Sequence, residues 1–436
     1  MSEIKDHQQE DSKSQGLPTA RRDFLSQGAA LLTGTSLAWS GCAPQKGNPS
    51  ESDIPATLAA GEKGFWRDIK KQFLIGPDAI YLNNASIWVP PQPVLDALAE
   101  HYRQISSNPT SAKGVLHQRI QKVVLPDLAG LIGADTDEIA FMSNATEGLD
   151  LITKGIPLKP GDEVLTTTHE HPAGIRPWRL RAARKGFTLR EIPIPSPLTS
   201  KDQAIDPLKQ AMNDRTKVLF FCQVTRGGLL YPVKELCGLA RERGIISAVD
   251  GAQAVANLRV DLHDLGCDLY ANSLHKWVLA PMGTGMLYVR KGFQEKFFPL
   301  DREDSPPGAA RYQAQGTKSI PIRASIGAAV EFINKIGMAR IEERNRMLSD
   351  HLKAELVKVP GIRLISSTSP QVSSPGMTMF EVRGQGGLEM RARFEEHQIG
   401  VDEHVRDGHD AVRVSTHFYN TIAEINRTIQ VLRELS

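Results

Sequence analysis

The sequence is poor in cysteine, with four among its 436 residues. Cys42, Cys222, Cys237 and Cys267 stand far apart and form neither a C-x-x-C pair nor any other spacing typical of metal ligands. This scarcity argues against a fold built on disulfide bonds and against a zinc ribbon.

An excess of charge of either sign is also lacking. The 52 lysines and arginines and the 50 aspartates and glutamates leave a formal net charge of +2, and no run of like charge stands out. A basic patch that binds nucleic acid or an anionic membrane is therefore not favoured. The hydrophobic share of 40% and the charged share of 23% are ordinary for a globular protein of one large or two medium domains.

The N-terminal region lacks a hydrophobic run long enough for a transmembrane helix. Two consecutive arginines, Arg21 and Arg22, precede a mildly apolar stretch that ends at Trp39. This order is typical of a twin-arginine export signal, which we assign to residues 1–42, so we expect a periplasmic protein. The alternative is a chance arginine pair in an unstructured arm.

Cys42 at the end of this segment adds a lipid-anchored N-terminus as a further alternative, although Trp39 suits that cleavage signal poorly. Residues 43–64 are rich in small residues and proline, which predicts a linker. The folded part of the chain is therefore expected to begin near residue 65.

Short apolar runs alternate with amphipathic segments through the middle of the chain. Val233–Arg243, with apolar Leu236, Leu239 and Ala240, predicts one of the intervening helices. Strands that alternate with helices favour the α/β class, with a mainly parallel sheet covered by helices. The predicted strands are Ile139–Met142, Glu163–Thr167, Thr188–Ile194, Lys217–Val224, Ile245–Val249, Leu269–Ala271 and Met286–Arg290.

The pattern changes toward the C-terminus. A long helical pattern covers Ile322–Val359, with an expected break near Gly337, and fewer strands follow it. We therefore predict a large domain over residues 106–320 and a smaller α+β domain over 321–436, which residues 65–105 join from the N-terminal side. The further predicted elements are strands at Arg363–Ile365, Met377–Val382 and Val412–Ser415 and helices at Leu388–His397 and Ile422–Leu435.

Lys276 lies between two apolar, strand-like runs, which is an unusual place for a side chain that water normally surrounds. Ser273 and His275 precede it, just after a predicted strand. Ligands of parallel α/β sheets bind beyond the carboxyl ends of the strands. A lysine that is desolvated there has a lowered pKa and can form a Schiff base.

Three other strand ends carry reactive side chains. Asp250 closes a buried strand, where an unpaired charge is costly and a cation or donor is required. Asn144 and Glu147 form a capping-box pattern that leaves free N–H groups at the start of a helix, which is a good phosphate site. His169 and His171 follow a third strand.

Together these residues match the needs of one aromatic cofactor, pyridoxal 5'-phosphate. An aldehyde needs an amine, a pyridine nitrogen needs a carboxylate to stay protonated, and a 5'-phosphate needs N–H and hydroxyl donors. Lys276, Asp250 and the helix start near Ala145 meet these needs. His169 and His171 could instead form a metal pair, but no third ligand with suitable spacing is present in the sequence, so we predict no metal site.

The order of these motifs resembles that of the class V aminotransferase family of fold-type I pyridoxal phosphate (PLP) enzymes. That family includes cysteine desulfurases and isopenicillin N epimerase-like proteins. The resemblance is carried by Asp250-x-x-Gln253 followed by Ser273-x-His275-Lys276. Further matches, which extend over the chain after about residue 65, are YLNNAS at Tyr81–Ser86, EHPAG at Glu170–Gly174, QGT at Gln315–Thr317 and VRVSTHFYNT at Val412–Thr421.

The resemblance implies a role for each matching residue. Lys276 would hold the cofactor and move the proton at the substrate Cα, Asp250 would pair with the pyridinium nitrogen, and His171 would stack on the ring. Gly316 and Thr317 would reach the phosphate of a neighbouring subunit, so a homodimer is implied. The other implied cofactor contacts are Gln253 near the phenolic oxygen of the ring and Ala145, Thr146, Ser273 and His275 at the phosphate.

The resemblance also implies a place for the substrate. Arg413 would bind its carboxylate in a bidentate pair, the geometry that arginine suits best, and Asn84 would lie near the substrate. Arg176 and Arg226, also near strand ends, are alternative ligands for a carboxylate or phosphate, but their location is the only argument for them.

Two departures from the family pattern bear on the reaction. The stretch CQVTRGGLLYP is one residue shorter than the family's ring-oxygen segment and puts Gln223, Thr225 and Arg226 where ring contacts are expected. The loop before Arg413 lacks the nucleophilic cysteine of desulfurases, and no other cysteine is placed to replace it. We therefore predict an enzyme that acts at the Cα of an amino acid by transamination or epimerisation. A lyase or desulfurase reaction and a catalytically silent, cofactor-bearing envelope protein remain alternatives.

Overall fold

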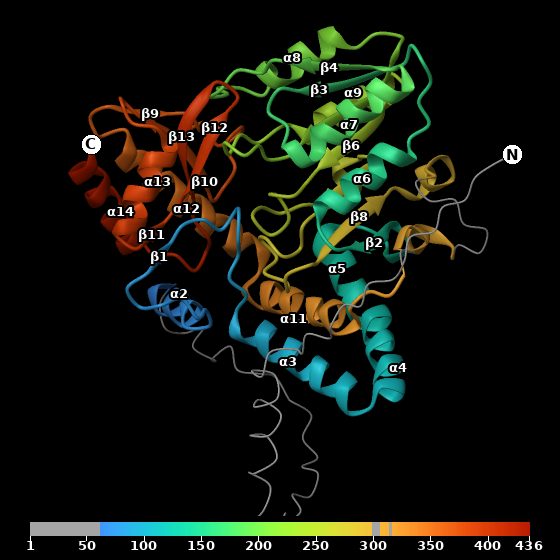
Figure 1. Cartoon of the computed structure of the whole chain (residues 1–436), viewed down its shortest axis with the longest axis horizontal. Coiled ribbons are helices and arrows are strands. Elements are labelled where there is room, and N and C mark those ends of the chain that lie inside the picture. Colours follow the sequence, from blue (N-terminus) through green and yellow to red (C-terminus); the bar gives the residue numbers. More distant parts are fainter. Residues whose placement is uncertain (1–61, 299–305, 314–315) are drawn as a thin grey trace, which may run out of the picture. The chain divides into compact units, whose positions relative to one another are not determined.

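The computed structural model describes residues 62–298, 306–313 and 316–436 of the chain (Figure 1). The predicted export signal with Cys42 and most of the predicted linker lie outside these residues. None of the helices within these ranges has the length and apolar character that a membrane span requires.

A seven-stranded sheet forms the largest sheet, with the order β2-β8-β7-β6-β5-β3-β4. Its strands from β7 to β4 pair in parallel, while β8 runs antiparallel to β2 and β7. The prediction of a mainly parallel sheet is confirmed, and every predicted strand of this sheet occurs. The strands are β2 (Ile139–Met142), β3 (Glu163–Thr167), β4 (Thr188–Ile192), β5 (Thr216–Cys222), β6 (Ile246–Asp250), β7 (Leu269–Asn272) and β8 (Gly285–Val289).

Alternate residues of these strands enter two separate cores, because successive side chains in a strand point to opposite faces. In β5, Val218 and Phe220 belong to the cluster that includes Trp178 of α7 (Pro172–Lys185), whereas Leu219 and Phe221 belong to the other cluster. Burial on both faces explains why the strands read as continuous apolar runs rather than as an alternation of apolar and polar residues.

Helices cover both faces of this sheet (Figure 1). α6 and α7 contribute to one core cluster, and α5, α8, α9 and α11 contribute to the other. The π-helical segment η1 joins α4 to α5 in one continuous helical stretch that the sequence analysis did not predict. The bounds are α3 (Gln92–Ser107), α4 (Pro109–Arg119), η1 (Ile120–Val124), α5 (Leu125–Ile132), α6 (Ala145–Gly155), α7 (Pro172–Lys185), α8 (Asp202–Ala211), α9 (Val233–Glu242), α10 (Leu262–Leu265) and α11 (Ile320–Ile336).

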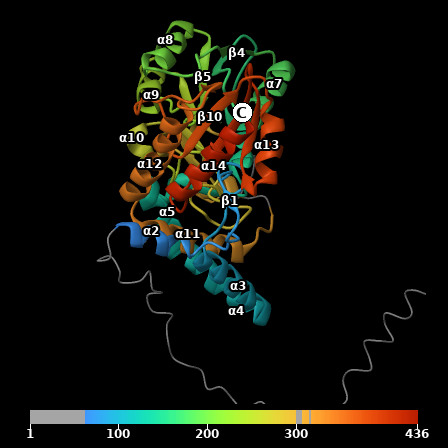
Figure 2. The same ribbon diagram turned by 90° about the vertical axis from the view of Figure 1, so that its left-hand side faces the viewer.

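The C-terminal part forms a four-stranded antiparallel sheet with the order β12-β13-β10-β9. α12, α13 and α14 share a separate core cluster with it, and Figure 2 looks onto these helices. The predicted helix break near Gly337 is confirmed, because this residue separates α11 from α12, but β12 was not predicted. The elements are α12 (Met338–Leu356), β9 (Ile362–Leu364), β10 (Met377–Val382), α13 (Gly387–Glu396), β12 (Asp402–Arg406), β13 (His409–Ser415) and α14 (Ile422–Leu435).

The segment before α3 packs against this C-terminal part. β1 (Ile80–Tyr81) pairs in parallel with β11 (Ile399–Gly400), and Asn83 forms an isolated bridge with Ser415 of β13. α2 (Glu62–Lys70) precedes it in the chain. These contacts bring the residues that follow Asn83 next to β13, more than three hundred positions away in the sequence.

Candidate active site

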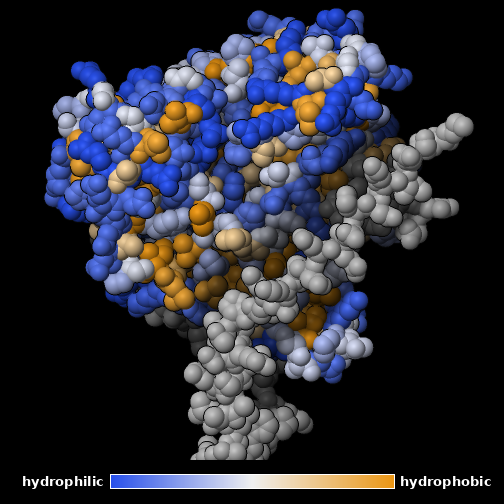
Figure 3. All heavy atoms as spheres, viewed as in Figure 1, coloured by the Kyte–Doolittle hydropathy of each residue, from blue (hydrophilic) through white to orange (hydrophobic). Residues whose placement is uncertain are grey.

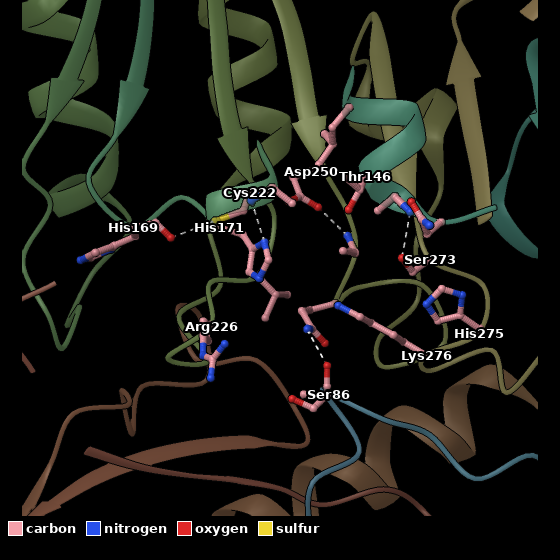
Figure 4. Close-up of a pocket in the computed structure, with 18 of the residues that line it drawn as sticks. Ser86, Thr146, His169, His171, Cys222, Arg226, Asp250, Ser273, His275 and Lys276 are labelled. Atoms are coloured by element: carbon pink, nitrogen blue, oxygen red, sulfur yellow. Dashed lines mark hydrogen bonds between the residues drawn. The ribbon is translucent and has the colours of Figure 1, made fainter. Parts of the chain in front are cut away.

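A cavity of about 320 Å³ opens where the carboxyl ends of β5, β6 and β7 meet (Figure 4). β5 and β6 end in Cys222 and Asp250, and both residues line the cavity. β13 and the segment after β1 supply the remaining wall. The predicted site residues that line it are Ala145, Thr146, His171, Asp250, Gln253, Ser273, His275, Lys276 and Arg413.

Lys276 lies in a tight turn after β7, where its backbone N–H donates to the Ser273 carbonyl at 3.1 Å. Its neighbours anchor the turn in the core, since Leu274 is 0% exposed and Trp277 is 1% exposed. The Lys276 side chain is open to the cavity, but protein surrounds it elsewhere. Burial lowers the pKa of its amine to about 8, although Asp250 acts in the opposite direction. A neutral, nucleophilic amine is therefore accessible near neutral pH.

The same turn holds a strained residue. Leu279 has a φ of 64°, in the left-handed region that a side chain with a Cβ disfavours. Its side chain is fully buried, and the next residue, Ala280, donates its N–H to the Leu274 carbonyl at 3.2 Å. Such strain persists where packing overdetermines the backbone, as it commonly does at functional sites.

Asp250 ends β6 in the cavity wall. One of its carboxylate oxygens accepts a hydrogen bond from the Ala252 N–H at 2.9 Å. The next residue is Gly251, and only glycine fits there, because a Cβ at this position would lie 1.9 Å from the ring of Tyr270. Burial raises the pKa of Asp250, whereas the Ala252 N–H and Lys276 lower it. A bound cationic group would stabilise the ionised carboxylate, so this position suits a protonated ring nitrogen.

The N-terminus of α6 lies at the cavity. The predicted cap is confirmed, because the Asn144 side chain accepts a hydrogen bond from the Glu147 N–H at 2.9 Å. The Ala145 N–H donates to the Ser273 hydroxyl at 2.9 Å, and Thr146 is exposed to the cavity. The positive end of the helix dipole together with the hydroxyls of Thr146 and Ser273 forms a site that favours phosphate.

His171 and His169 point in different directions (Figure 4). The Nδ1 of His171 accepts a hydrogen bond from the Ala173 N–H at 3.1 Å, which fixes its ring at the start of α7. His169 instead pairs through Nδ1 with the Tyr231 hydroxyl at 2.9 Å. In the described chain these histidines therefore engage separate partners, and they do not form the metal pair considered from the sequence.

The surroundings of His171 favour its neutral form at physiological pH. Desolvation by the surrounding protein lowers its pKa, and the charge of Lys276 lowers it further, although part of the ring is open to the cavity. Both effects act in the same direction, so the neutral state follows even if desolvation is incomplete. A neutral, flat ring of fixed orientation is suited to stacking on an aromatic cofactor.

His275 and Gln253 are held by their neighbours. The His275 ring packs on Trp88 with ring centroids 4.3 Å apart, and its buried Nδ1 has no hydrogen-bond partner within the described residues. The Gln253 side chain donates to the Ala85 carbonyl at 3.0 Å and accepts from the Trp277 indole at 2.8 Å. Gln253 thus keeps one amide N–H for a ligand, and His275 keeps one ring nitrogen.

Charged side chains form the opposite wall. Arg413 of β13 is 2% exposed and donates to the Ser86 hydroxyl at 2.7 Å and to the Asp402 carboxylate. Arg226, from the loop after β5, donates to the same oxygen of Asp402 at 3.1 Å. Burial lowers the pKa of Arg413 to about 10, which Asp402 counteracts, so the guanidinium stays charged. Burial would raise the pKa of Asp402, but Arg413, Ser86 and Arg226 together hold it below its usual value.

The residues present fit the predicted cofactor. The cavity offers an amine of lowered pKa, a buried carboxylate that calls for a cationic partner, and a helix start suited to a dianion. The unpartnered Nδ1 of His275 is a further buried polar atom that a bound group could satisfy. Lys276 and Asp250 would hold the ring, and Thr146, Ser273 and His275 would hold the phosphate.

Three predicted residues lie away from this cavity. Asn84 is buried and donates to the Ser415 carbonyl at 2.8 Å, while its neighbours Ala85 and Ser86 line the wall in its place. Gly316 and Thr317 are also not among the residues that line the cavity of their own chain. Their contact with the phosphate of a second subunit stays a prediction.

The ring-oxygen segment differs from expectation. The residues that line the cavity are Cys222, Val224 and Arg226, whereas the expected Gln223 and Thr225 alternate with them and point elsewhere. Gln223 accepts a hydrogen bond from the Tyr270 hydroxyl at 2.6 Å inside the protein. The alternation of an extended chain could have predicted this set, because the side chains of every second residue share one face.

Sequence reasoning also missed Ser86 and Asp402 as part of the site. Both are bonded to Arg413, and Ser86 donates to Asp402 at 2.8 Å across 316 positions of sequence. No local pattern marks such a contact, so only the position of Ser86 within the matching YLNNAS motif could have suggested it.

Comparisons with known proteins bear on this geometry. The family model described as Aminotransferase class-V matches residues 80–428. Isopenicillin N epimerase from Amycolatopsis lactamdurans is 30% identical over 395 residues, covering 85% of this chain and 98% of that protein. A cysteine desulfurase from Synechococcus elongatus is 29% identical over 432 residues, covering 90% of this chain and 67% of that protein.

Solved structures show the same fold. The apo structure of a cysteine desulfurase from Thermococcus onnurineus NA1 superposes with a TM-score of 0.77 at 25% identity, covering 84% of this chain and 97% of that one. A mutant of C-DES with glycine covalently linked to the PLP cofactor also gives a TM-score of 0.77 at 25% identity, covering 84% of this chain and 99% of that one. The described fold is thus that of PLP-dependent class V enzymes.

Proposed function

Since the chain belongs to the class-V aminotransferase family of PLP-dependent enzymes, we propose that it acts at the α-carbon of an amino acid, by transamination or epimerisation. The observation that carries this proposal is the meeting of Lys276, Asp250 and the start of α6 around one cavity. Pyridoxal 5'-phosphate is the cofactor that these three features suit.

The bound cofactor withdraws electrons from the α-carbon and makes its proton acidic. Asp250 would keep a positive charge on the ring nitrogen, because a cationic partner stabilises a buried carboxylate. Lys276 would hold the aldehyde carbon and, with a pKa of about 8, could accept and return a proton at the α-carbon near neutral pH. His171 lies at the cavity as a neutral, flat partner for the ring.

Arg413 is the group that we expect to bind the α-carboxylate of the substrate. Its Nη2 atom is occupied by Ser86 and Asp402, whereas its buried Nε has no hydrogen-bond partner within the described residues. A substrate carboxylate would supply the missing acceptor, and charge-assisted bonds of this kind are the strong ones.

The proposed reaction needs no thiol of this chain. Cys222, Cys237 and Cys267 are buried, and burial raises the pKa of each thiol, so the nucleophilic thiolate is scarce. Cys222 does line the cavity, yet it is the last residue of a central strand and not part of an exposed loop. This favours transamination or epimerisation over a desulfurase reaction.

The test is to incubate the full-length holoenzyme with L- and D-amino acids and with 2-oxo acids, and to follow the cofactor spectrum together with the products. Transamination releases a 2-oxo acid, and epimerisation inverts the α-carbon without releasing one. Both exchange the α-proton with deuterium from the solvent. A protein that neither exchanges this proton nor forms a product with any of them would contradict the proposal. Sulfide release from L-cysteine that disappears in Cys222→Ser would favour the desulfurase alternative.

We also propose that the enzyme is a homodimer. Large hydrophobic side chains are exposed on α3, α4 and η1 at Tyr102, Val115 and Val123. Figure 3 shows further hydrophobic residues gathered around α2 and α11 on the face seen in Figure 1. Surface of this kind is typical of an interface with another protein. Light scattering coupled to size exclusion tests the proposal, and a monomer at micromolar concentration would contradict it.

Export by the twin-arginine route is a proposal that rests on the sequence alone. Replacing Arg21 and Arg22 with lysine should leave the protein in the cytoplasm, because this route reads the arginine pair. Cell fractionation measures the outcome. Unchanged secretion of the double variant would contradict the signal assignment.

A further inference from the structure

We propose that Arg226 forms a second anion subsite in the cavity, so that the substrate is an amino acid with a second acidic group on a short side chain. This inference rests on the proposed function, because it names the substrate class of the same site. It makes Arg226 a specificity residue, distinct from Arg413, which is expected to bind the α-carboxylate.

Arg226 is placed to contact a ligand. It lines the cavity, and Figure 4 shows its guanidinium on the side of His171 that faces away from Asp250. Its side chain is 15% exposed. Through Nη2 it donates to Asp402 at 3.1 Å and to the Glu403 carbonyl at 2.7 Å, while its buried Nε has no hydrogen-bond partner in the described chain. Its donors are therefore only partly used.

The carboxylate nearest to Arg226 is shared with a second arginine. Arg413 and Arg226 share a single oxygen of Asp402. The next carboxylate, Glu403, lies 3.7 Å from Arg226 but is itself bonded by Arg391 at 2.9 Å. Arg413 and Arg226, whose side chains are 2% and 15% exposed, thus share one carboxylate within hydrogen-bond distance, while Glu403 and Asp407 act on Arg226 from farther away. An additional anion is the ligand that this pair of arginines favours.

The geometry restricts the length of the substrate side chain. The Nη2 atoms of Arg413 and Arg226 both reach the same oxygen of Asp402, so the two guanidinium groups lie close together at one carboxylate. A ligand with its α-carboxylate on Arg413 can place a second acid on Arg226 only when few bonds separate the two acids. Side chains with one or two methylene groups before the acid meet this condition.

A purely structural role for Arg226 is the competing explanation. In that case the Arg226–Asp402 pair fastens the start of β12 to the loop after β5, and no substrate group contacts it. The two explanations differ in what a second acid group on the ligand does to affinity, which can be measured without turnover.

The experiment is calorimetric titration of the full-length holoenzyme with succinate and with butyrate, which have equal carbon number but differ in one carboxylate. Succinate should bind at least about tenfold more tightly, because charge-assisted hydrogen bonds to a partly buried guanidinium are gained. In Arg226→Gln this ratio should fall to within about threefold, and Arg226→Lys should keep an intermediate ratio because the charge remains but the planar fork is lost. Arg363→Gln is the matched control, since it removes an arginine that pairs with Glu381 in the same C-terminal sheet and does not line the cavity, and its ratio should match that of the native protein.

Equal affinities for succinate and butyrate in the native holoenzyme would overturn the inference. So would a preference for succinate that survives in a folded Arg226→Gln protein, or a lowered melting temperature as the sole effect of that variant. These outcomes are separable from failure of the proposed function. An enzyme that turns over neutral amino acids as well as acidic ones refutes the second subsite and keeps the chemistry at Cα, whereas an enzyme without any turnover refutes the chemistry itself.

Discussion

The cavity has two walls that differ in how the fold builds them. The cofactor wall, formed by Thr146, Asp250, Ser273 and Lys276, lies at neighbouring strand ends of one sheet and is positioned mainly by backbone contacts. The substrate wall, formed by Ser86, Arg226, Asp402 and Arg413, joins three distant segments through charged hydrogen bonds.

This difference predicts different sensitivities to substitution. A side chain of the cofactor wall can be removed without disturbing the strand ends that carry it, so chemistry should be lost and the fold kept. A side chain of the substrate wall is also part of the contact between segments. Its removal leaves a charged partner unpaired, so binding and stability should fall together.

The largest expected effect is that of Lys276→Ala, which tests the cofactor wall. Turnover should fall by at least ~10²–10⁴-fold, because a positioned acid–base group is lost together with the amine that holds the cofactor. Borohydride reduction should attach the cofactor to the peptide containing Lys276 in the native protein and to no peptide in the variant. The melting temperature should change little. A label on another lysine, or full turnover in the variant, would refute the site.

Asp250→Ala should have the next largest effect on the reaction. The cofactor should remain attached to Lys276, but exchange of the α-proton should slow by about 10²-fold or more, since the charge that stabilises the electron-rich state is gone. Deuterium incorporation measured by mass spectrometry checks the rate. An unchanged rate would mean that Asp250 does not contact the ring nitrogen.

On the substrate wall, Arg413→Gln should affect both binding and folding. Asp402 would lose its closest cationic partner but keep Arg226 at 3.1 Å, which should cost about 2 kcal/mol of unfolding free energy. Adding Asp402→Asn in the same chain should recover part of this loss, because the carboxylate that lost one of its two guanidinium partners is removed. Urea denaturation of the two single variants and the double variant measures the coupling. If the effects of the two single variants on the unfolding free energy simply add in the double variant, Arg413 and Asp402 do not stabilise each other. The substrate wall would then not depend on charged hydrogen bonds as expected.

A smaller effect concerns the pH dependence of cofactor attachment. The rate at which PLP attaches to the cofactor-free protein should rise with pH and reach half of its maximum near pH 8, because the reactive neutral amine of Lys276 forms as the pH passes its pKa. In Asp250→Ala the midpoint should move to lower pH, since Asp250 raises this pKa. Stopped-flow absorbance between pH 6 and 10 measures both. A midpoint near that of a solvent-exposed lysine would contradict burial of the amine.

The smallest effect is expected for Glu170→Gln, behind the cofactor wall. Burial raises the pKa of Glu170 to about 8, so the carboxyl is protonated at neutral pH and a neutral amide can replace it. Between pH 4.5 and about 8 the unfolded chain releases this proton while the folded chain retains it, so the native protein loses stability as the pH rises. The variant should lack that loss. Urea denaturation at pH 5 and pH 8 gives the change in unfolding free energy with pH for both proteins. An equal change in the native protein and the variant would show that Glu170 is ionised in the fold.

Much of the cofactor wall could be predicted from the sequence. Lys276 lies within a few residues of the apolar runs that desolvate it, and Asp250 directly follows the strand that buries it. The cap at Asn144 is likewise a local pattern. The strands could be recognised because each must present apolar side chains to helices on both faces of the sheet. Local sequence was informative here because the segments that bury Lys276 and Asp250, and the helix start that Asn144 caps, lie within one turn or one strand of these residues.

The substrate wall, by contrast, was decided by tertiary structure. The sequence could indicate Arg413 through its motif, but it could not show that Asp402 and Ser86 share its guanidinium or that Arg226 reaches the same oxygen. It also placed Asn84 at the substrate, where the fold buries that amide against Ser415 instead. Charge pairing acts through space over a few ångströms and is independent of separation along the chain, so these contacts exist only once β1, β12 and β13 have come together.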